Sequence, residues 1–257
     1  MHTTLLAIAK DEYKNIEEWL DWHFNLGFDK IILIINEELN DKYFKFCEKF
    51  KSKLELIFFN QPMRFLNSNK KIVDSQSKLY TMSIDKIEID IDWLTIIDLD
   101  EFIEFKDGSK DIHEFIKKYN NGNNVIELYW ETYDDNDLIF ESEESNGVIN
   151  SYTRILEKPF FNYGADEFNL TKCIFKYNRD TSGLCAHGPT EYFNLGNTNF
   201  YKPNKLDKSI GVIRHYRTKC LEYYIKHKIL KCKAHLSGYT NYGNCIFTRF
   251  FSNKSIH

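Results

Sequence analysis

Residues 93–105 read WLTIIDLDEFIEF, an apolar run that delivers Asp98, Asp100 and Glu101 at its end. A short apolar run of this kind is typical of a buried β-strand, so we expect a strand over residues 93–97. A carboxylate beside a buried strand loses its water, which costs free energy unless a positive group meets it. The stretch therefore predicts a buried strand and a cationic partner for the acids that follow it.

The residues before this stretch alternate between apolar runs and amphipathic patterns. Near-continuous apolar strands that alternate with helices indicate a mainly parallel sheet with helices on both faces. Gly27 follows an amphipathic run at the position that suits the C′ glycine of a helix. The expected strands are TTLLAIA (3–9), DKIILIINEE (29–38) and LELIFFN (54–60), and the expected helices lie within residues 15–28, 41–50 and 74–89.

The pattern changes after residue 105. A helix is expected within residues 107–119, with Ser109 as its N-cap, and a strand over residues 124–133. Residues 134–205 are rich in glycine, asparagine and aromatic residues, which suggests loops and an antiparallel extension. The run TKCLEYYIKHKILKCKAHL (218–236) predicts a C-terminal helix. The fold class is therefore α/β.

The composition is that of a folded globular protein. The 257 residues are 42% hydrophobic and 28% charged, and the mean hydropathy is −0.49. No apolar stretch is long enough to span a bilayer, and the first residues lack the basic region of a signal peptide, so we expect a cytoplasmic protein. The net charge of −4 argues against a nucleic-acid-binding protein. Basic residues predominate in residues 201–257, either as a solvated face or as a surface for phosphate groups or an anionic membrane.

The six cysteines include no CxxC pair, so reduced thiols are expected. Cys220, His227, Cys232 and His235 are the only grouping that invites comparison with a zinc site. Their spacing fits no zinc-finger pattern, and one helix would turn the two cysteines to different sides. We therefore do not expect zinc.

The two aspartates predict a site at the carboxyl end of the strand. Ligands of open α/β sheets bind beyond this end of the strands. On a strand, residues i and i+2 point the same way, so the carboxylates of Asp98 and Asp100 would converge and repel. Mg²⁺ or Mn²⁺ would relieve that repulsion. The alternative is a capped strand end with solvated acids.

Four stretches of the chain resemble bacterial glycosyltransferases of the family 2/family 92 type, which have the GT-A fold. They are AIAKDEYKNIEEWLDWHFNLGFDKIILI (7–34), WLTIIDLDEFIEF (93–105), CAHGPTEYFN (185–194) and IRHYRTKCLEYYIKH (213–227), in the order of the family. The resemblance implies a single GT-A-like domain over residues 1–257. Residues 1–105 would form the nucleotide-sugar-binding half, and residues 106–257 the acceptor-side half with the C-terminal helices.

The resemblance also implies a metal site. Asp100 would be the main ligand of Mn²⁺ or Mg²⁺ on the donor diphosphate, with Asp98 contacting the metal or the donor. His187 matches a histidine that completes the site from the C-terminal half, and an imidazole suits Mn²⁺ better than Mg²⁺. The alternative for His187 is a loop histidine bonded to the backbone.

Several residues match donor-binding positions of the family. Asn36 and Glu37 stand where relatives usually have an Asp-Asn pair, so INEELND (35–41) departs from the family pattern. Asp11 could instead be a helix N-cap, and Gln76 could lie on a solvated helix face. The segment RHYRTK (214–219) is either the part that closes over the diphosphate or a basic surface turn. The predicted donor-binding residues are Lys10, Asp11, Glu12, Asn36, Gln76, Arg214, His215, Arg217 and Lys219.

The reaction implied by the resemblance is transfer of a hexosyl unit from a UDP-sugar to an acceptor hydroxyl, with inversion, in surface polysaccharide or lipopolysaccharide synthesis. The acceptor would be a glycan or a lipid-linked glycan, and contact with the inner face of the membrane would be peripheral. Inversion requires a carboxylate base near the acceptor hydroxyl. The candidates are Glu131, Asp134, Asp135, Asp166, Glu167 and Glu191, of which Asp166 and Glu167 in the loop NYGADEF are favoured.

Two other functions stay open. In a phosphohydrolase, Asp98 would be the nucleophile and Asp100 the acid/base. Such enzymes place the pair after the first strand, with Thr or Val two residues beyond the second aspartate, where this chain has Phe102. The third possibility is a non-catalytic module that binds a nucleotide or sugar: the intact Asp98/Asp100 pair argues against it, and the divergent INEELND segment favours it mildly.

Overall fold

The computed structural model describes residues 1–10, 12–38, 41–59, 64–66, 72–87, 90–144, 146–156, 170–180, 183–190, 192 and 201–230. The chain divides into two compact units. Unit 1 consists of Met1–Trp130 and Asn169–His215, and unit 2 of Glu131–Phe168 and Tyr216–His257.

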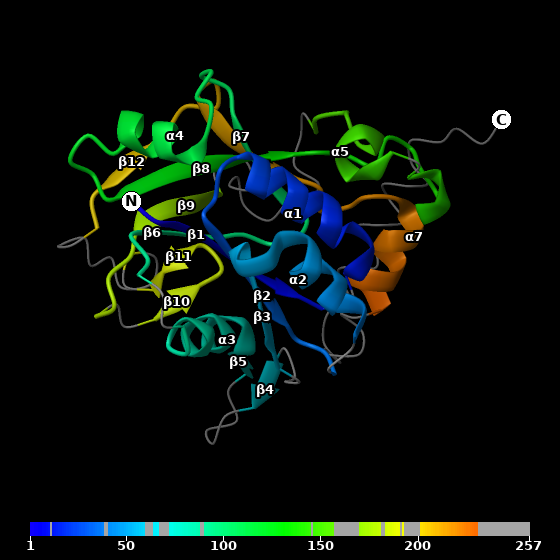
Figure 1. Cartoon of the computed structure of the whole chain (residues 1–257). Helices are drawn as coiled ribbons and strands as arrows, with labels where there is room; N and C mark the ends of the chain where they lie inside the picture. Colours follow the sequence, from blue (N-terminus) through cyan, green and yellow to red (C-terminus); the bar gives the residue numbers. More distant parts are fainter. Residues whose placement is uncertain are drawn as a thin grey trace. The chain divides into compact units, whose positions relative to one another are not determined.

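Within the described part of the chain, nine strands form one sheet in the order β3-β2-β1-β6-β9-β8-β13-β7, with β12 paired to β8 (Figure 1). The strands are β1 (Thr3–Ala9), β2 (Lys30–Ile35), β3 (Leu54–Phe58), β6 (Trp93–Ile96), β7 (Glu101–Phe105), β8 (Val125–Thr132), β9 (Thr171–Lys176), β12 (Pro203–Lys205) and β13 (Gly211–His215).

The sheet has a parallel half and a mainly antiparallel half. Strand β1 runs parallel to β2 and β6, and β2 runs parallel to β3. Beyond β6, the pairs β6–β9, β8–β9 and β7–β13 are antiparallel. Almost every residue of β1, β2 and β6 is buried, which explains why these strands read as continuous apolar runs. The predicted α/β class, with parallel strands followed by an antiparallel extension, is confirmed.

The helices of unit 1 are α1 (Ile16–Asn25), α2 (Phe44–Phe50), α3 (Ser75–Ile84) and α4 (Ile112–Tyr119), with the 3₁₀ turns η1 (Tyr13–Asn15), η2 (Asp41–Tyr43) and η3 (Lys51–Lys53). The described part of unit 1 also contains two small antiparallel strand pairs: β4 (Arg64–Leu66) with β5 (Ile72–Asp74), and β10 (Leu184–Cys185) with β11 (Gly188–Pro189). Unit 2 contains η4 (Glu141–Glu143), α5 (Gly147–Ser151), α7 (Leu221–Tyr224) and the π-helix η6 (Ile225–Leu230).

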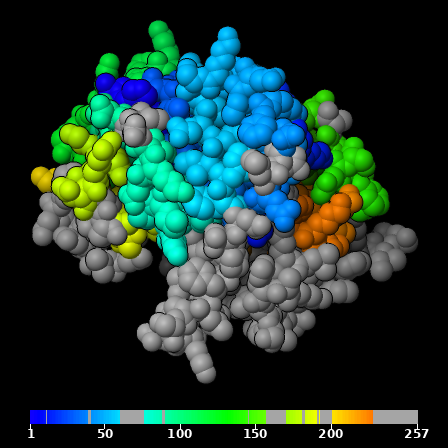
Figure 2. Space-filling view, turned by 60° about the horizontal axis from the view of Figure 1, so that its bottom comes forward, coloured from blue at the N-terminus to red at the C-terminus, as the bar shows by residue number. Residues whose placement is uncertain are grey.

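Helix α3 packs against β6, the strand that leads to the acidic segment, and α1 packs against β7, the strand that follows it. Helix α3 buries Tyr80 and Ile84 in a cluster with Leu6, Leu94 and Ile96 from β1 and β6. It also lies beside β10, because the Leu184 amide donates to the Thr81 hydroxyl at 3.1 Å, and Figure 2 shows these two segments side by side on the surface. The sheet and α3 together fix the end of β6.

Helix α1 holds the start of β7 through its tryptophans. The indole N–H of Trp19 donates to the carbonyl oxygen of Glu101 at 2.8 Å, and that of Trp22 donates to Ile103 at 2.7 Å. Trp19 is fully buried, as the helical spacing predicted. The backbone of Glu101 is therefore anchored from the helix.

One predicted cap is wrong. Helix α4 is capped by Asp111, whose carboxylate accepts from the Glu114 amide at 2.8 Å. The hydroxyl of Ser109 instead donates to Asp107 at 2.8 Å. Both are good capping residues, and the helix begins only after the second one.

Among the described residues, no helix combines the length and the apolar character that crossing a membrane requires.

Candidate active site

The acidic turn, residues 97–101, joins β6 to β7. Strand β6 ends at Ile96, and the amide of Glu101 donates to the carbonyl oxygen of Asp98 at 3.1 Å, which closes the turn. The expectation that Asp98 and Asp100 lie on a strand is therefore wrong, so strand spacing gives no ground for expecting their carboxylates to converge. The side chain of Asp98 is 37% exposed, whereas Asp100 is 5% exposed.

The cationic partner of the acidic turn is Lys172 on β9. Its ammonium lies 3.0 Å from Oδ2 of Asp98 and 3.2 Å from Oε2 of Glu101, and it donates to the carbonyl oxygen of Ala186 at 2.6 Å. The lysine is only 1% exposed. Sequence reasoning missed it, although a lysine within the alternating strand TKCIFKY was the available signal.

Burial and the neighbouring charges determine the ionisation of this group. Burial opposes the charge of Lys172, but Asp98 and Glu101 overcome that effect, so the pKa of the lysine lies above its ordinary value. Burial raises the pKa of Glu101 to about 8, with Asp98 and Asp100 adding to the effect and Lys172 opposing it. Near neutral pH, the charge of Lys172 is therefore balanced chiefly by Asp98.

Gln76 on α3 contacts the other oxygen of Asp98. Its Nε2 donates to Oδ1 of Asp98 at 3.2 Å and to the Tyr80 hydroxyl at 3.1 Å. The structure thus brings Gln76 to the acidic turn, which favours the family position over a solvated helix face. Its role in donor binding stays a prediction.

His187 lies in the turn between β10 and β11. Its Nδ1 is 2.9 Å from the carbonyl oxygen of Thr171, and because a carbonyl only accepts, Nδ1 carries the proton and Nε2 the lone pair. Burial and the nearby charge of Lys172 lower the pKa of His187, so the imidazole is neutral near pH 7. The backbone bond suggested as an alternative to a ligand role is therefore present, and by fixing the ring it also sets the direction of the Nε2 lone pair.

His215 and Trp130 lie on the side of Asp100. Nε2 of the buried His215, at the end of β13, is 3.8 Å from Oδ1 of Asp100. The ring of Trp130 on β8 is 4.2 Å from that of His215 and 5.9 Å from that of His187, measured between centroids. Trp130 is 9% exposed, and its indole N–H has no hydrogen-bond partner within the described part of the chain. No sequence pattern singled out Trp130.

Arg214 is engaged elsewhere. Its Nε donates to Glu104 at 2.8 Å, a second guanidinium nitrogen contacts the same carboxylate, and the group lies 5.7 Å from the Trp22 ring. Neighbouring residues of a strand point to opposite faces, so Arg214 and His215 diverge. The structure does not bring Arg214 to the acidic turn.

The residues after β1 and β2 lie at the same edge of the sheet as the acidic turn, because β1, β2 and β6 are parallel. Lys10 and Glu12 follow β1, and the buried Asn36 follows β2. The backbone amide of Asn36 donates to the carbonyl oxygen of Ala9 at 2.9 Å. In the divergent segment INEELND, the carboxylate of Glu37 forms an ion pair with the ammonium of Lys42, which lies 3.0 Å from Oε2.

The remaining predicted donor residues and bases belong to unit 2 or lie outside the described residues. In unit 2, Arg217 is partly buried, and Lys219 is buried with its ammonium 4.3 Å from the Tyr223 ring centroid. Glu131 accepts from the Tyr133 hydroxyl at 3.5 Å. The residues outside the described ranges are Asp11, Asp166, Glu167 and Glu191, together with Cys232 and His235 of the zinc grouping.

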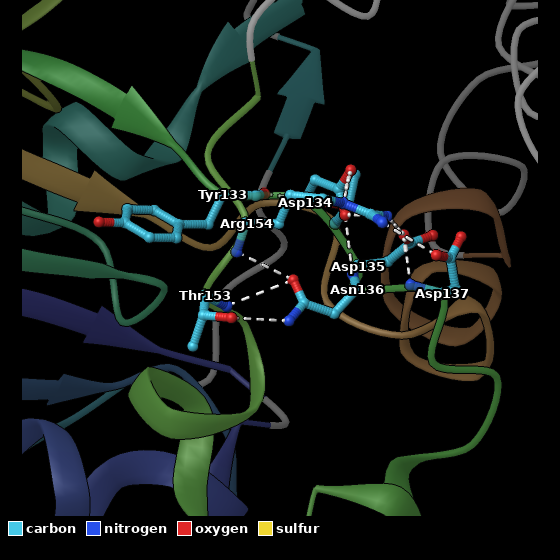
Figure 3. A network of polar contacts seen from close by, with 8 residues as sticks. Tyr133, Asp134, Asp135, Asn136, Asp137, Thr153 and Arg154 are labelled. Carbon is cyan, nitrogen blue, oxygen red and sulfur yellow. Dashed lines mark hydrogen bonds and ion pairs between the residues drawn. The ribbon is translucent and has the colours of Figure 1, made fainter.

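Asp134 and Asp135 belong to a network around Arg154 in unit 2 (Figure 3). The guanidinium of Arg154 donates twice to Asp134, at 2.9 and 2.8 Å, and once to Asp137 at 2.9 Å. Asp135 is 3.6 Å from the same group. These contacts give both base candidates a structural partner that the sequence did not reveal.

The side-chain atoms near the acidic turn are of the types that bind a divalent cation, but they do not form a preorganised metal site. No group of three His, Cys, Asp or Glu side chains in the described ranges is arranged to hold a metal ion. Asp98 nevertheless offers a partly exposed carboxylate, Asp100 a second one, and His187 a neutral imidazole with its lone pair on Nε2. Carboxylate and imidazole together suit Mn²⁺, so the residues fit the ion, with Lys172 as a competitor for Asp98.

Comparison with solved structures finds similar chains at low scores. HddC from Yersinia pseudotuberculosis is 13% identical over 88% of this chain and 97% of its own, with a TM-score of 0.42. The 4-diphosphocytidyl-2C-methyl-D-erythritol synthase from Anaerococcus prevotii is 11% identical over 90% and 96%, with a TM-score of 0.44. Core-mannan synthase A from Aspergillus fumigatus, in its Mn/GDP form, is 9% identical over 54% and 44%, with a TM-score of 0.32. Scores below 0.5 carry no argument about function.

The sequence comparisons are more decisive. No curated protein matches the chain. The profile of glycosyltransferase family 92 matches residues 6–243, which includes the acidic turn, Lys172, His187 and His215. A match over nearly the whole chain, on an α/β fold with these residues gathered at one edge of its sheet, shows that the chain belongs to glycosyltransferase family 92.

Proposed function

We propose that the chain transfers a hexosyl unit from a UDP-sugar to a hydroxyl of a glycan or lipid-linked glycan, with inversion, in surface polysaccharide or lipopolysaccharide synthesis. Membership of the family supports glycosyl transfer. The observation that carries the proposed location is the partly exposed carboxylate of Asp98 at the carboxyl end of β6, which accepts hydrogen bonds from Gln76 and Lys172. Ligands of α/β sheets bind at such an end.

In this proposal, Asp98, Asp100 and His187 hold Mn²⁺ or Mg²⁺. When bound, the ion would offset the negative charge on the departing diphosphate. The chain's own contacts prepare two of these groups: Gln76 holds one oxygen of Asp98, and the Thr171 carbonyl fixes the tautomer of His187. Held side chains lose less conformational entropy when a ligand arrives.

Donor binding would involve the residues after the parallel strands. Lys10, Asp11, Glu12 and Asn36 follow β1 and β2 in the sequence, and His215 lies near Asp100. Arg214, Arg217 and Lys219 remain donor residues only by resemblance to the family, and Arg214 would have to leave Glu104 to serve. Asp166 or Glu167 remains the proposed catalytic base.

The proposed location in the cell is the cytoplasm, at the inner face of the membrane. The support is the excess of lysine and arginine in residues 201–257, since basic segments are attracted to anionic lipid.

A thermal-shift screen of nucleotides and UDP-sugars, with and without Mn²⁺, tests the proposal. A ligand at 100 times its Kd stabilises the protein by about 2.7 kcal/mol, so a true donor raises the melting temperature clearly. Asp100→Ala should lose this response, whereas Asp90→Ala, a matched change at an exposed aspartate, should keep it. Release of UDP from the stabilising donor is then measured with glycan acceptors.

Three results would contradict the proposal. Wild type could fail to respond to any nucleotide, or Asp100→Ala could respond as strongly as wild type. Hydrolysis of a generic phosphate ester in Mg²⁺, without release of UDP, would support the phosphohydrolase instead.

A further inference from the structure

Strand β9 connects the two turns that supply the proposed metal ligands, the acidic turn and the turn that contains His187. The ammonium of Lys172 contacts Asp98 and Glu101 in the acidic turn and the carbonyl oxygen of Ala186, the residue before His187. The preceding residue, Thr171, accepts from the imidazole of His187. Two neighbouring residues of one strand thus hold the acidic turn and the His187 turn in place.

The contacts of Lys172 are those of a counter-ion. The ammonium is 1% exposed, and three protein groups at 2.6–3.2 Å surround it: the carboxylate of Asp98, the carboxyl group of Glu101 and the carbonyl oxygen of Ala186. An ammonium has three protons to donate, so these contacts satisfy it. Removing it would leave the carboxylate of Asp98 without its cation and would take a hydrogen-bond donor away from the buried carboxyl group of Glu101.

A divalent cation and Lys172 would compete for the same carboxylate. A cation bound to Asp98 would share that group with an ammonium 3.0 Å from its Oδ2. Two cations on one carboxylate repel each other, and the repulsion is strong where water is excluded. Lys172 therefore lowers the affinity of the acidic turn for any second cation.

We propose that Lys172 is a positioning residue that serves as the built-in cation of the acidic turn: it holds the Asp98 and His187 turns together without metal, and it weakens the binding of free divalent cations to Asp98. The inference rests on the proposed function only in taking Asp98 as a metal ligand. It predicts that the fold needs no metal and that the site gains metal affinity when the lysine is lost.

Mn²⁺ binding to Lys172→Met, without nucleotide, tests this inference. Methionine keeps an unbranched apolar side chain and removes the charge. The electron paramagnetic resonance signal of free Mn²⁺ should show binding at least ~10-fold tighter than in wild type, because the repulsion is gone. Adding Asp98→Asn should abolish the gain. A purely structural lysine would not change the affinity for Mn²⁺ in this direction.

Thermal stability gives a second measurement. Wild type should melt at the same temperature in EDTA and in Mn²⁺, whereas Lys172→Met should melt lower in EDTA and recover in Mn²⁺. Lys176→Met is the matched control, because Lys176 is on the same strand, is exposed, and lies at the opposite end of β6, paired with Trp93. It should behave like wild type.

Two further variants keep the test decisive if Lys172→Met does not fold. The pair Glu101→Gln and Lys172→Met removes a buried acid together with the lysine and should still gain Mn²⁺ affinity. Lys172→Arg keeps a cation and should stay within about threefold of wild type. Unchanged or weaker Mn²⁺ binding in the charge-removing variants would overturn the inference. Because no donor is present, this result is independent of whether the chain releases UDP from any UDP-sugar.

Discussion

His23 is a buried histidine whose ring is fully used in its neutral form. Its Nδ1 donates to the Trp19 carbonyl oxygen at 2.8 Å, and its Nε2 accepts from the Ile103 amide at 3.4 Å. Burial lowers its pKa from 6.5 to about 3. Between these two values the unfolded chain binds a proton that the folded chain does not, so stability is complete above pH 6.5 and is lost as the pH falls.

We therefore expect His23 to cost the protein about 2 kcal/mol of unfolding free energy between pH 7 and pH 5. Urea denaturation at both pH values measures the loss. His23→Gln should be less stable at pH 7 but should show a pH dependence smaller by that amount, and His2→Gln, at an exposed site, should keep the dependence of wild type. Equal pH dependence in wild type and His23→Gln would show that another group is responsible.

At the scale of single residues, the sequence predicted the acids but not their partners. Asp98 and Gln76 could be selected from their positions relative to a strand and a helix. Lys172 stands out as a lysine within an alternating strand, but its partner could not be read from the sequence, because the contact joins residues 74 positions apart and depends on β9 pairing with β6. The same holds for Trp130, whose ring meets His215 only once β8 and β13 lie side by side.

At the scale of elements, Gly27 shows why helix α1 ends where it does. The residue has φ = +87°, which favours glycine, and an added Cβ would lie 3.0 Å from Cβ of Asp111, the N-cap of α4. The amide of Ile112 also donates to the Leu26 carbonyl oxygen at 2.8 Å. The end of one helix and the start of another are therefore in direct contact.

Gly27→Ala should lower the unfolding free energy by about 2 kcal/mol, part from the left-handed backbone and part from crowding. Gly122→Ala is the matched control, because Gly122 has φ = +79° and nothing within 4 Å of an added Cβ. It should cost about 1 kcal/mol, the backbone part alone. Urea denaturation measures both, and equal losses would show that the contact with Asp111 adjusts without cost.

Helices and strands were predicted correctly where the apolar pattern is long. The prediction failed where strand pairing, and not the local sequence, determines the structure. The strand at 3–9 and the helices in 15–28 and 74–89 follow apolar periodicity and were found within a few residues of the predicted ends. Strand β13 (Gly211–His215) was not predicted. Its sequence, GVIRH, is short, and its structure comes from pairing with β7.

At the scale of the whole molecule, the fold class followed from the sequence, but the two units did not. Unit 2 contains the ion-pair network of Arg154 with Asp134 and Asp137. The acids lie in a loop in which Asn136 and Asp137 have positive φ. Nothing in the sequence links this arginine to those acids.

Arg154→Leu should loosen unit 2 locally and leave unit 1 unchanged. The arginine is half exposed, so solvent screens its ion pairs and the change in overall stability should be below about 1 kcal/mol. Hydrogen exchange measured by mass spectrometry should increase in residues 131–156, because three acids lose their common cation, and should not change in β1, β2 and β6. Lys49→Gln, which breaks the pairs with Glu17 and Asp21 in unit 1, is the control and should not affect residues 131–156. Faster exchange throughout the chain would contradict local loosening.

The position of β13 has a consequence for biosynthesis. It fills the place between β8 and β7, and it pairs with residues more than a hundred positions earlier in the chain. On the ribosome, β7 and β8 are translated long before the strand that separates them. Until residue 215 emerges, a nascent chain carries two apolar strands with unpaired edges, the kind of intermediate that chaperones bind. Completion of this sheet is therefore a late event in the synthesis of the domain.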